Sequence, residues 1–203
     1  IENEENIVKR CGAKPNDLLV VTGDLGGAYM GLQILEREHS VFLADPNMQP
    51  EMEGFDYILE RQLKPEARTD VKATLEQLDI KPTSMIDVSD GLASEILHLS
   101  DQSKVGFRLY EEKVPMDNLT ITTADEFNLN PVMTALSGGE DYELLFTISP
   151  NDLDKKKNQP EFTIIGHAVE KEEGNFMVAR GSNQLVALTA QGWDAFLSNQ
   201  QND

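Results

Sequence analysis

One stretch decides the fold of this chain, M-I-D-V-S-D-G-L at residues 85–92. Its apolar first half predicts a β-strand that ends at Asp87. Residues 91–99 predict an α-helix, because their leucine and isoleucine side chains recur at helical spacing. Asp90 is then expected at the N-cap of this helix, where aspartate is a preferred residue.

The turn between the predicted strand and helix gathers Asp87, Ser89 and Asp90 beside a helix N-terminus, which carries partial positive charge and unpaired amide groups. Mg²⁺ needs only one or two carboxylates plus substrate phosphates, so the turn predicts a site for a metal ion and a phosphate. The alternative is an ordinary turn, because Asp is a common N-cap and Asp-Gly a common turn pair. That alternative leaves the repulsion between two neighbouring acids unexplained, whereas a bound cation removes it.

Composition narrows the class of protein. The chain has 203 residues, 39% of them apolar, which is enough for one large domain or for a domain with an extension. The 17 basic and 36 acidic residues give a net charge of −19, which argues against nucleic acid and against an anionic membrane surface as partners. Cys11 is the only cysteine, so no internal disulfide forms and a cytoplasmic location is expected.

The remaining elements are predicted from apolar spacing and from glycine and proline breaks. The expected helices are 25–38, 55–63, 70–78 with Asp70 as its cap, and a helical turn at 123–127. The expected strands are 17–22, 105–110 and 144–148, and an antiparallel pair at 162–170 and 175–179. The cations in the loop 64–68 are expected to be solvated.

A second stretch with candidate chemistry is A-L-S-G-G-E-D-Y-E-L-L-F-T-I at residues 135–148. Its two glycines permit backbone conformations that other residues resist, and three acids follow before an apolar strand begins. The alternative is a glycine turn that only leads into a strand.

Four segments together resemble the thiamine-monophosphate kinases: R-C-G-A-K-P at 10–15, I-D-V-S-D-G at 86–91, L-S-G-G-E-D-Y-E-L at 136–144, and G-W at 192–193. The resemblance covers nearly the whole chain. A single segment would indicate only the wider superfamily, which includes aminoimidazole ribonucleotide synthase and selenophosphate synthetase. The implied fold is α+β, a two-layer α/β sandwich whose mixed sheet has helices on one face.

The resemblance implies direct transfer of the γ-phosphate of ATP to thiamine monophosphate, with Mg²⁺ and without a covalent enzyme intermediate. It implies that Asp87 and Asp90 are Mg²⁺ ligands. It also implies that Arg10 and Ser89 contact ATP, and that Glu140 and Trp193 contact the thiamine part. Phosphoryl transfer requires such groups, because it depends on alignment and on neutralising phosphate oxygens. A cationic thiazolium would suit an acid and an indole face.

The chain departs from the family pattern in two respects. Cys11 stands where the family usually has Ser, and the N-terminal half of such kinases, with its acidic metal loop and dimer-forming sheet, is missing. Residues 1–203 are therefore expected to be the C-terminal ligand-binding domain of a larger kinase, with 1–15 leading in from that half, and the homodimer is expected to form through it.

We expect negligible kinase turnover from the 203 residues alone. Three alternatives remain open: another ATP-dependent enzyme of the superfamily, such as a selenophosphate or aminoimidazole ribonucleotide synthase; a non-enzymatic binding module stabilised by metal; and a purely structural fragment.

Overall fold

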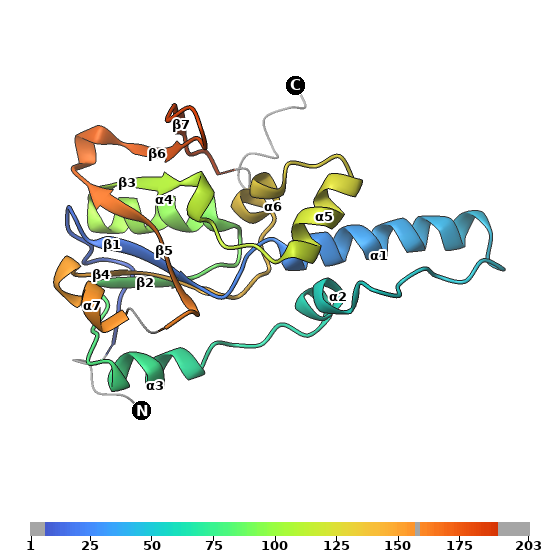
Figure 1. Cartoon of the computed structure of the whole chain (residues 1–203), viewed down its shortest axis with the longest axis horizontal. Helices are drawn as coiled ribbons and strands as arrows, with labels where there is room; N and C mark the ends of the chain where they lie inside the picture. Colours follow the sequence, from blue (N-terminus) through green and yellow to red (C-terminus); the bar gives the residue numbers. More distant parts are fainter. Residues whose placement is uncertain (1–6, 157–158, 191–203) are drawn as a thin grey trace, which may run out of the picture.

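The computed structural model describes residues 7–156 and 159–190, which fold into a mixed β-sheet with helices around it (Figure 1). Seven strands of the described chain lie in the order β2-β4-β1-β5-β3-β6-β7. The strands are β1 (Leu18–Thr22), β2 (Ser84–Asp87), β3 (Gly106–Tyr110), β4 (Leu144–Ile148), β5 (Phe162–Val169), β6 (Asn175–Val178) and β7 (Leu185–Ala187). This arrangement confirms the predicted α+β class with a mixed sheet.

Strands β5 and β6 do not pair with each other, so the predicted antiparallel pair was wrong. Strand β3 lies between them, antiparallel to β5 and parallel to β6. The Asn175 side chain contributes to this order, because its Oδ1 accepts a hydrogen bond from the N–H of Phe107 at 2.9 Å. Both strands therefore exist, but the strand that separates them comes from much earlier in the chain.

Alternate residues of β1 face two different cores, as the pleat of a strand requires. Leu19 and Val21 pack in the main core with α4 (Leu92–Ser103) and α6 (Pro131–Ser137). Val20 packs in a second core with α3 (Asp70–Gln77). The expected helical layer on one face is therefore formed by α4 and α6, and α3 covers part of the other face.

Three helices form a separate group beyond one end of the sheet: α1 (Gly27–Ala44), α2 (Asp56–Leu63) and α5 (Asn118–Glu126) (Figure 1). Their shared core contains Met30, Ile34, Ile58 and Ala124. Among the described residues, no helix is both long and apolar enough to cross a membrane.

Three helices depart from the predicted boundaries, and a fourth was not predicted. Helix α1 ends at residue 44 instead of 38, α4 ends at residue 103 instead of 99, and α5 begins at residue 118 instead of 123. Helix α6 occupies a segment for which no element was predicted. The Asp117 side chain caps α5 by accepting a hydrogen bond from the N–H of Leu119 at 2.7 Å. The Asn130 side chain caps α6 in the same way, by accepting a bond from the N–H of Val132 at 2.9 Å. The last described α-helix is α7 (Leu153–Lys156).

Candidate metal and phosphate site

The candidate site forms where the turn after β2 meets the glycine turn before β4. The Glu140 N–H donates to the carbonyl of Ser89 at 2.8 Å, and the Tyr142 N–H donates to the carbonyl of Val88 at 2.9 Å. These bonds continue the β2–β4 ladder beyond the strand ends. The two acidic stretches are therefore side by side.

Gly139 allows this close approach of the two turns. Its φ is +68°, and a Cβ at this position would lie 2.5 Å from the carbonyl oxygen of Ser89. Glu140 and Tyr142 also have positive φ values, 62° and 52°. Such left-handed residues are strained and are often found at functional sites.

Asp90 does not cap α4, contrary to the prediction. The N-cap residue is Gly91, and no side chain forms a capping hydrogen bond there. Glu95, in the first turns of the helix, instead holds the preceding turn, because its Oε1 accepts bonds from the N–H groups of Ser89 at 3.2 Å and Asp90 at 3.0 Å. The carboxylates of Asp87 and Asp90 are exposed and form no ion pair with another described residue. The interpretation of Asp90 as only a cap was therefore wrong.

Glu140 contacts the hydroxyl of Tyr142. That hydroxyl donates a hydrogen bond to Glu140 Oε2 at 2.9 Å. The bond and the negative charge of Glu140 raise the pKa of Tyr142, and the charges of Asp87 and Asp90 add to the effect. Glu140 is therefore the predicted site carboxylate that contacts this hydroxyl, and the charges of the other two act on it without a direct contact.

The structure places the other predicted site residues, Ser89, Arg10 and Trp193, differently with respect to the acidic turn. Ser89 lies in the site turn and is half-buried, with its hydroxyl 3.3 Å from Glu95 Oε1. Arg10 is exposed and lies near β2, since the carbonyl of the preceding Lys9 accepts a bond from the Met85 N–H at 2.9 Å. The Arg10 guanidinium forms no ion pair or hydrogen bond with a described acid, and only the Arg10 carbonyl accepts a side-chain hydrogen bond, from Ser103. Trp193 lies outside the described residues.

A buried ionic network adjoins the site and was not predicted from the sequence. Glu143 is 2% exposed and pairs with Arg68 Nη1 at 2.6 Å and Arg61 Nη1 at 2.9 Å. The Thr22 hydroxyl also donates to Glu143. The expectation that the loop cations are solvated was therefore wrong for Arg68, whose side chain is 15% exposed, and it holds for Lys64, which is 75% exposed.

Asp141 connects the glycine turn to the beginning of α1. Its two oxygens accept hydrogen bonds from the N–H groups of Gly26 at 2.8 Å and Ala28 at 3.4 Å. Burial raises the pKa of Asp141 to about 6, although these bonds and the charge of Arg61 act in the opposite direction. The glycine turn is thus fixed on one side by Asp141 and on the other by its pairing with Ser89.

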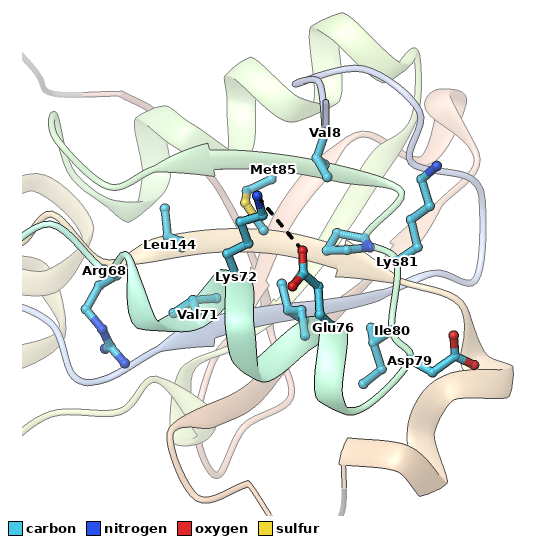
Figure 2. Close-up of a pocket in the computed structure, with 12 residues that line it drawn as sticks. Val8, Arg68, Val71, Lys72, Glu76, Asp79, Ile80, Lys81, Met85 and Leu144 are labelled. Carbon is cyan, nitrogen blue, oxygen red and sulfur yellow. Dashed lines mark ion pairs between the residues drawn. The ribbon is translucent and has the colours of Figure 1, made fainter. Parts of the chain in front are cut away.

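A cavity of about 540 Å³ lies between α3 and β2 (Figure 2). Its apolar lining includes Val71, Leu75 and Met85, and Leu144 of β4. Asp87 shares a sheet face with Met85, since side chains alternate along a strand, and it lies opposite Leu144 in the ladder. The cavity is therefore next to the acidic site, although no predicted site residue lines it.

The fold and the acidic turn define the class of protein. Residues 14–179 match the family described as "AIR synthase related protein, C-terminal domain". The chain belongs to this family.

Within this class the chain is similar to thiamine-monophosphate kinases. It is 32% identical over 195 residues to the enzyme from Aquifex aeolicus, and this match covers 95% of this chain and 56% of that protein. It is 34% identical over 193 residues to the enzyme from Escherichia coli K12, and this match covers 92% of this chain and 54% of that protein. A solved structure described as "AaThiL complexed with AMPPCP and TMP" matches with a TM-score of 0.76 and 30% identity, over 95% of this chain and 55% of that one. The chain thus spans about half the length of the curated relatives it matches.

Proposed function

We propose that this chain is the C-terminal, ligand-binding part of a thiamine-monophosphate kinase. The proposed reaction is direct transfer of the γ-phosphate of ATP to thiamine monophosphate, which yields thiamine diphosphate. The observation that carries the proposal is that backbone hydrogen bonds hold the turn bearing Asp87 and Asp90 beside the glycine turn bearing Glu140. In the matching solved structure, the ligands named are AMPPCP and TMP, which supports nucleotide and thiamine monophosphate as ligands.

The donor set of this turn fits Mg²⁺. Magnesium prefers oxygen ligands and is usually held by one or two carboxylates together with phosphates. Asp87 and Asp90 have this chemistry, and neither carboxylate is neutralised by a lysine or arginine of the described chain. When bound, Mg²⁺ would offset the negative charge of the phosphate oxygens during transfer.

The chain's own groups would bind and align the two substrates. Ser89 and Arg10 are proposed to contact ATP, through a hydroxyl that donates hydrogen bonds and a guanidinium that suits phosphate oxygens. Glu140 and Trp193 are proposed to hold the cationic thiamine part through charge pairing and cation–π attraction. No group of this chain is proposed to form a covalent intermediate.

We propose that turnover also requires the part of the relatives that lies outside the match. Residues 1–203 would then be one domain, with 1–15 leading in, of a cytoplasmic homodimer that assembles through that part. The purified 203 residues should give negligible thiamine diphosphate from ATP. A fusion of this chain behind the N-terminal half of the Aquifex aeolicus relative should produce it. Robust turnover by the 203 residues alone would contradict this division.

Ligand-dependent melting of the 203-residue chain tests the binding part of the proposal. Mg²⁺ with AMPPCP should raise the melting temperature of the wild type, and Asp87→Asn or Asp90→Asn should remove the increase. Glu172→Gln is the matched control, because it makes the same charge change at an exposed position near the opposite edge of the sheet. A similar increase in all variants would contradict the role of the acidic turn.

The same measurement separates the other candidate functions. A binding module stabilised only by metal would respond to Mg²⁺ or Ca²⁺ and ignore nucleotide. Another enzyme of the superfamily would bind nucleotide but would not prefer thiamine monophosphate over related phosphate esters in competition. A structural fragment would respond to none of these ligands.

A further inference from the structure

The beginning of α4 carries metal-ligating side chains that the proposed kinase chemistry does not use. Glu95 and His98 are three residues apart on this helix, so they lie on one face, and Asp90 lies in the turn before it. One carboxylate oxygen of Asp90, one of Glu95 and one ring nitrogen of His98 all lie within 4.8 Å of one another. Both kinds of atom are common metal ligands.

Glu95 is the fixed member of this group. It is 1% exposed, and its Oε1 accepts hydrogen bonds from the amides of Ser89 and Asp90. Its Oε2 is buried and has no hydrogen-bond partner among the described residues. A buried carboxylate oxygen without a partner is unfavourable. No described lysine or arginine forms an ion pair with Glu95, so the unmatched oxygen indicates a missing cation or donor.

We propose that Asp90, Glu95 and His98 bind one divalent transition-metal ion, with Zn²⁺ as the representative ion. The imidazole indicates this class, because Zn²⁺ and its first-row neighbours accept nitrogen ligands, whereas Mg²⁺ favours oxygen. Ligand atoms around such an ion lie about 3–3.5 Å apart, given metal–ligand distances near 2 Å. Asp90 and His98 are exposed and can approach by side-chain rotation, while Glu95 stays in place.

This ion requires no nucleotide, and its ligand set contains neither Asp87 nor Glu140. Asp90 is the only residue shared with the proposed Mg²⁺ site. An experiment can therefore contradict the transition-metal site without contradicting the proposed Mg²⁺ site, and the reverse. Asp87→Asn should impair binding of Mg²⁺ with AMPPCP and leave Zn²⁺ affinity unchanged, whereas His98→Ala should have the opposite pattern.

Calorimetric titration with Zn²⁺ alone, in a buffer that does not chelate it, tests the site. All proteins should carry Cys11→Ser, because Cys11 is an exposed free thiol that could bind Zn²⁺ itself. This reference chain should bind one equivalent of Zn²⁺. His98→Ala should lower the affinity at least tenfold, by analogy with the losses seen when groups that support metal sites are removed. His39→Ala, at an exposed position of α1, is the matched control and should leave the affinity unchanged.

Visible absorption of bound Co²⁺ gives a second readout that reports ligand geometry. His98→Ala and Glu95→Gln should both weaken the absorption, with circular dichroism confirming that each variant is folded. His98→Ala decides the question, because an exposed side chain can be removed without unfolding the chain. The proposal is wrong if the reference chain shows no saturable binding, if His98→Ala and His39→Ala lose affinity equally, or if His98→Ala lowers only the melting temperature.

Discussion

Arg68 and Glu143 form an ion pair with 2.6 Å between Nη1 and Oε2, although 75 residues separate them in sequence. The same guanidinium contacts Asp70 at 2.9 Å and Glu161 at 2.6 Å. It therefore connects the beginnings of α3, β4 and β5 directly beside the acidic site. Because Glu143 is almost fully buried, solvent screens its pairing weakly.

Removal of this guanidinium should destabilise the fold. Arg68→Ala leaves Glu143 buried with only one cation, so the free energy of unfolding should fall by about 2–4 kcal/mol. Urea denaturation measures the change. Lys64→Ala is the matched control in the same loop, because its ion pair with Glu60 is exposed, and it should cost less than about 0.5 kcal/mol. Equal losses in the two variants would contradict the buried network.

Asp141 should make stability depend on pH. Its folded pKa of about 6 lies above the unfolded value of about 3.9, so the folded chain holds the proton more tightly. Its favourable contribution is complete below about pH 4 and is lost as the pH rises through 6.

Asp141→Asn cannot titrate at this position. The stability of this variant relative to the wild type should therefore rise by up to about 3 kcal/mol between pH 4 and pH 7. Urea denaturation at several pH values tests this. Asp24, whose pKa burial also raises, titrates in both proteins, so its own contribution largely cancels. A stability difference that does not change with pH would refute the assignment.

A methyl group at Gly139 should force the two turns apart. Gly139→Ala combines a left-handed backbone with a Cβ that would lie 2.5 Å from the Ser89 carbonyl oxygen. Gly54→Ala is the control, since Gly54 has φ +87° but no atom within 4 Å of its Cβ position. Gly54→Ala should cost about 1–2 kcal/mol from backbone strain alone. Gly139→Ala should cost more in urea denaturation and should weaken binding of Mg²⁺ with AMPPCP.

Trp193 offers a direct test of the proposed thiamine contact. It is the only tryptophan in the chain, so intrinsic tryptophan fluorescence reports this residue alone. Thiamine monophosphate should quench the emission in a saturable manner, because a bound cationic ring would stack on the indole. Thiamine monophosphate should also bind more weakly to Glu140→Gln. Emission that does not change on addition of thiamine monophosphate would count against this contact.

The local elements of the fold were predictable from the sequence. The strands ending at Thr22 and Asp87 are compact apolar runs closed by glycine or acid, and the structure has both within one residue of the predicted ends. Helix α6 was missed, although Asn130 followed by Pro131 is a strong start signal.

The pairing of distant segments was not predictable in the same way. Nothing near residues 162–178 indicates that β3 separates β5 from β6, because hydrogen-bonded partners of a strand are not encoded locally. The ion pair between Arg68 and Glu143 was likewise not predictable, because 75 residues separate the two side chains in sequence. The role of Glu95 did have a local signal, since an acid near the first turn of a helix often reaches back to the preceding amides.

The position of β2 in the sheet decides when the acidic site can form during synthesis of the chain. This strand is at the edge of the sheet that the described residues form, and among the described strands it pairs with β4 alone. While the ribosome has not yet delivered residues 139–148, Asp87 at the end of β2 and Asp90 in the turn after it lack both the partner strand β4 and Glu140. A nascent chain truncated before that segment should therefore capture no magnesium nucleotide, and the capacity should arise in one step when β4 emerges and docks.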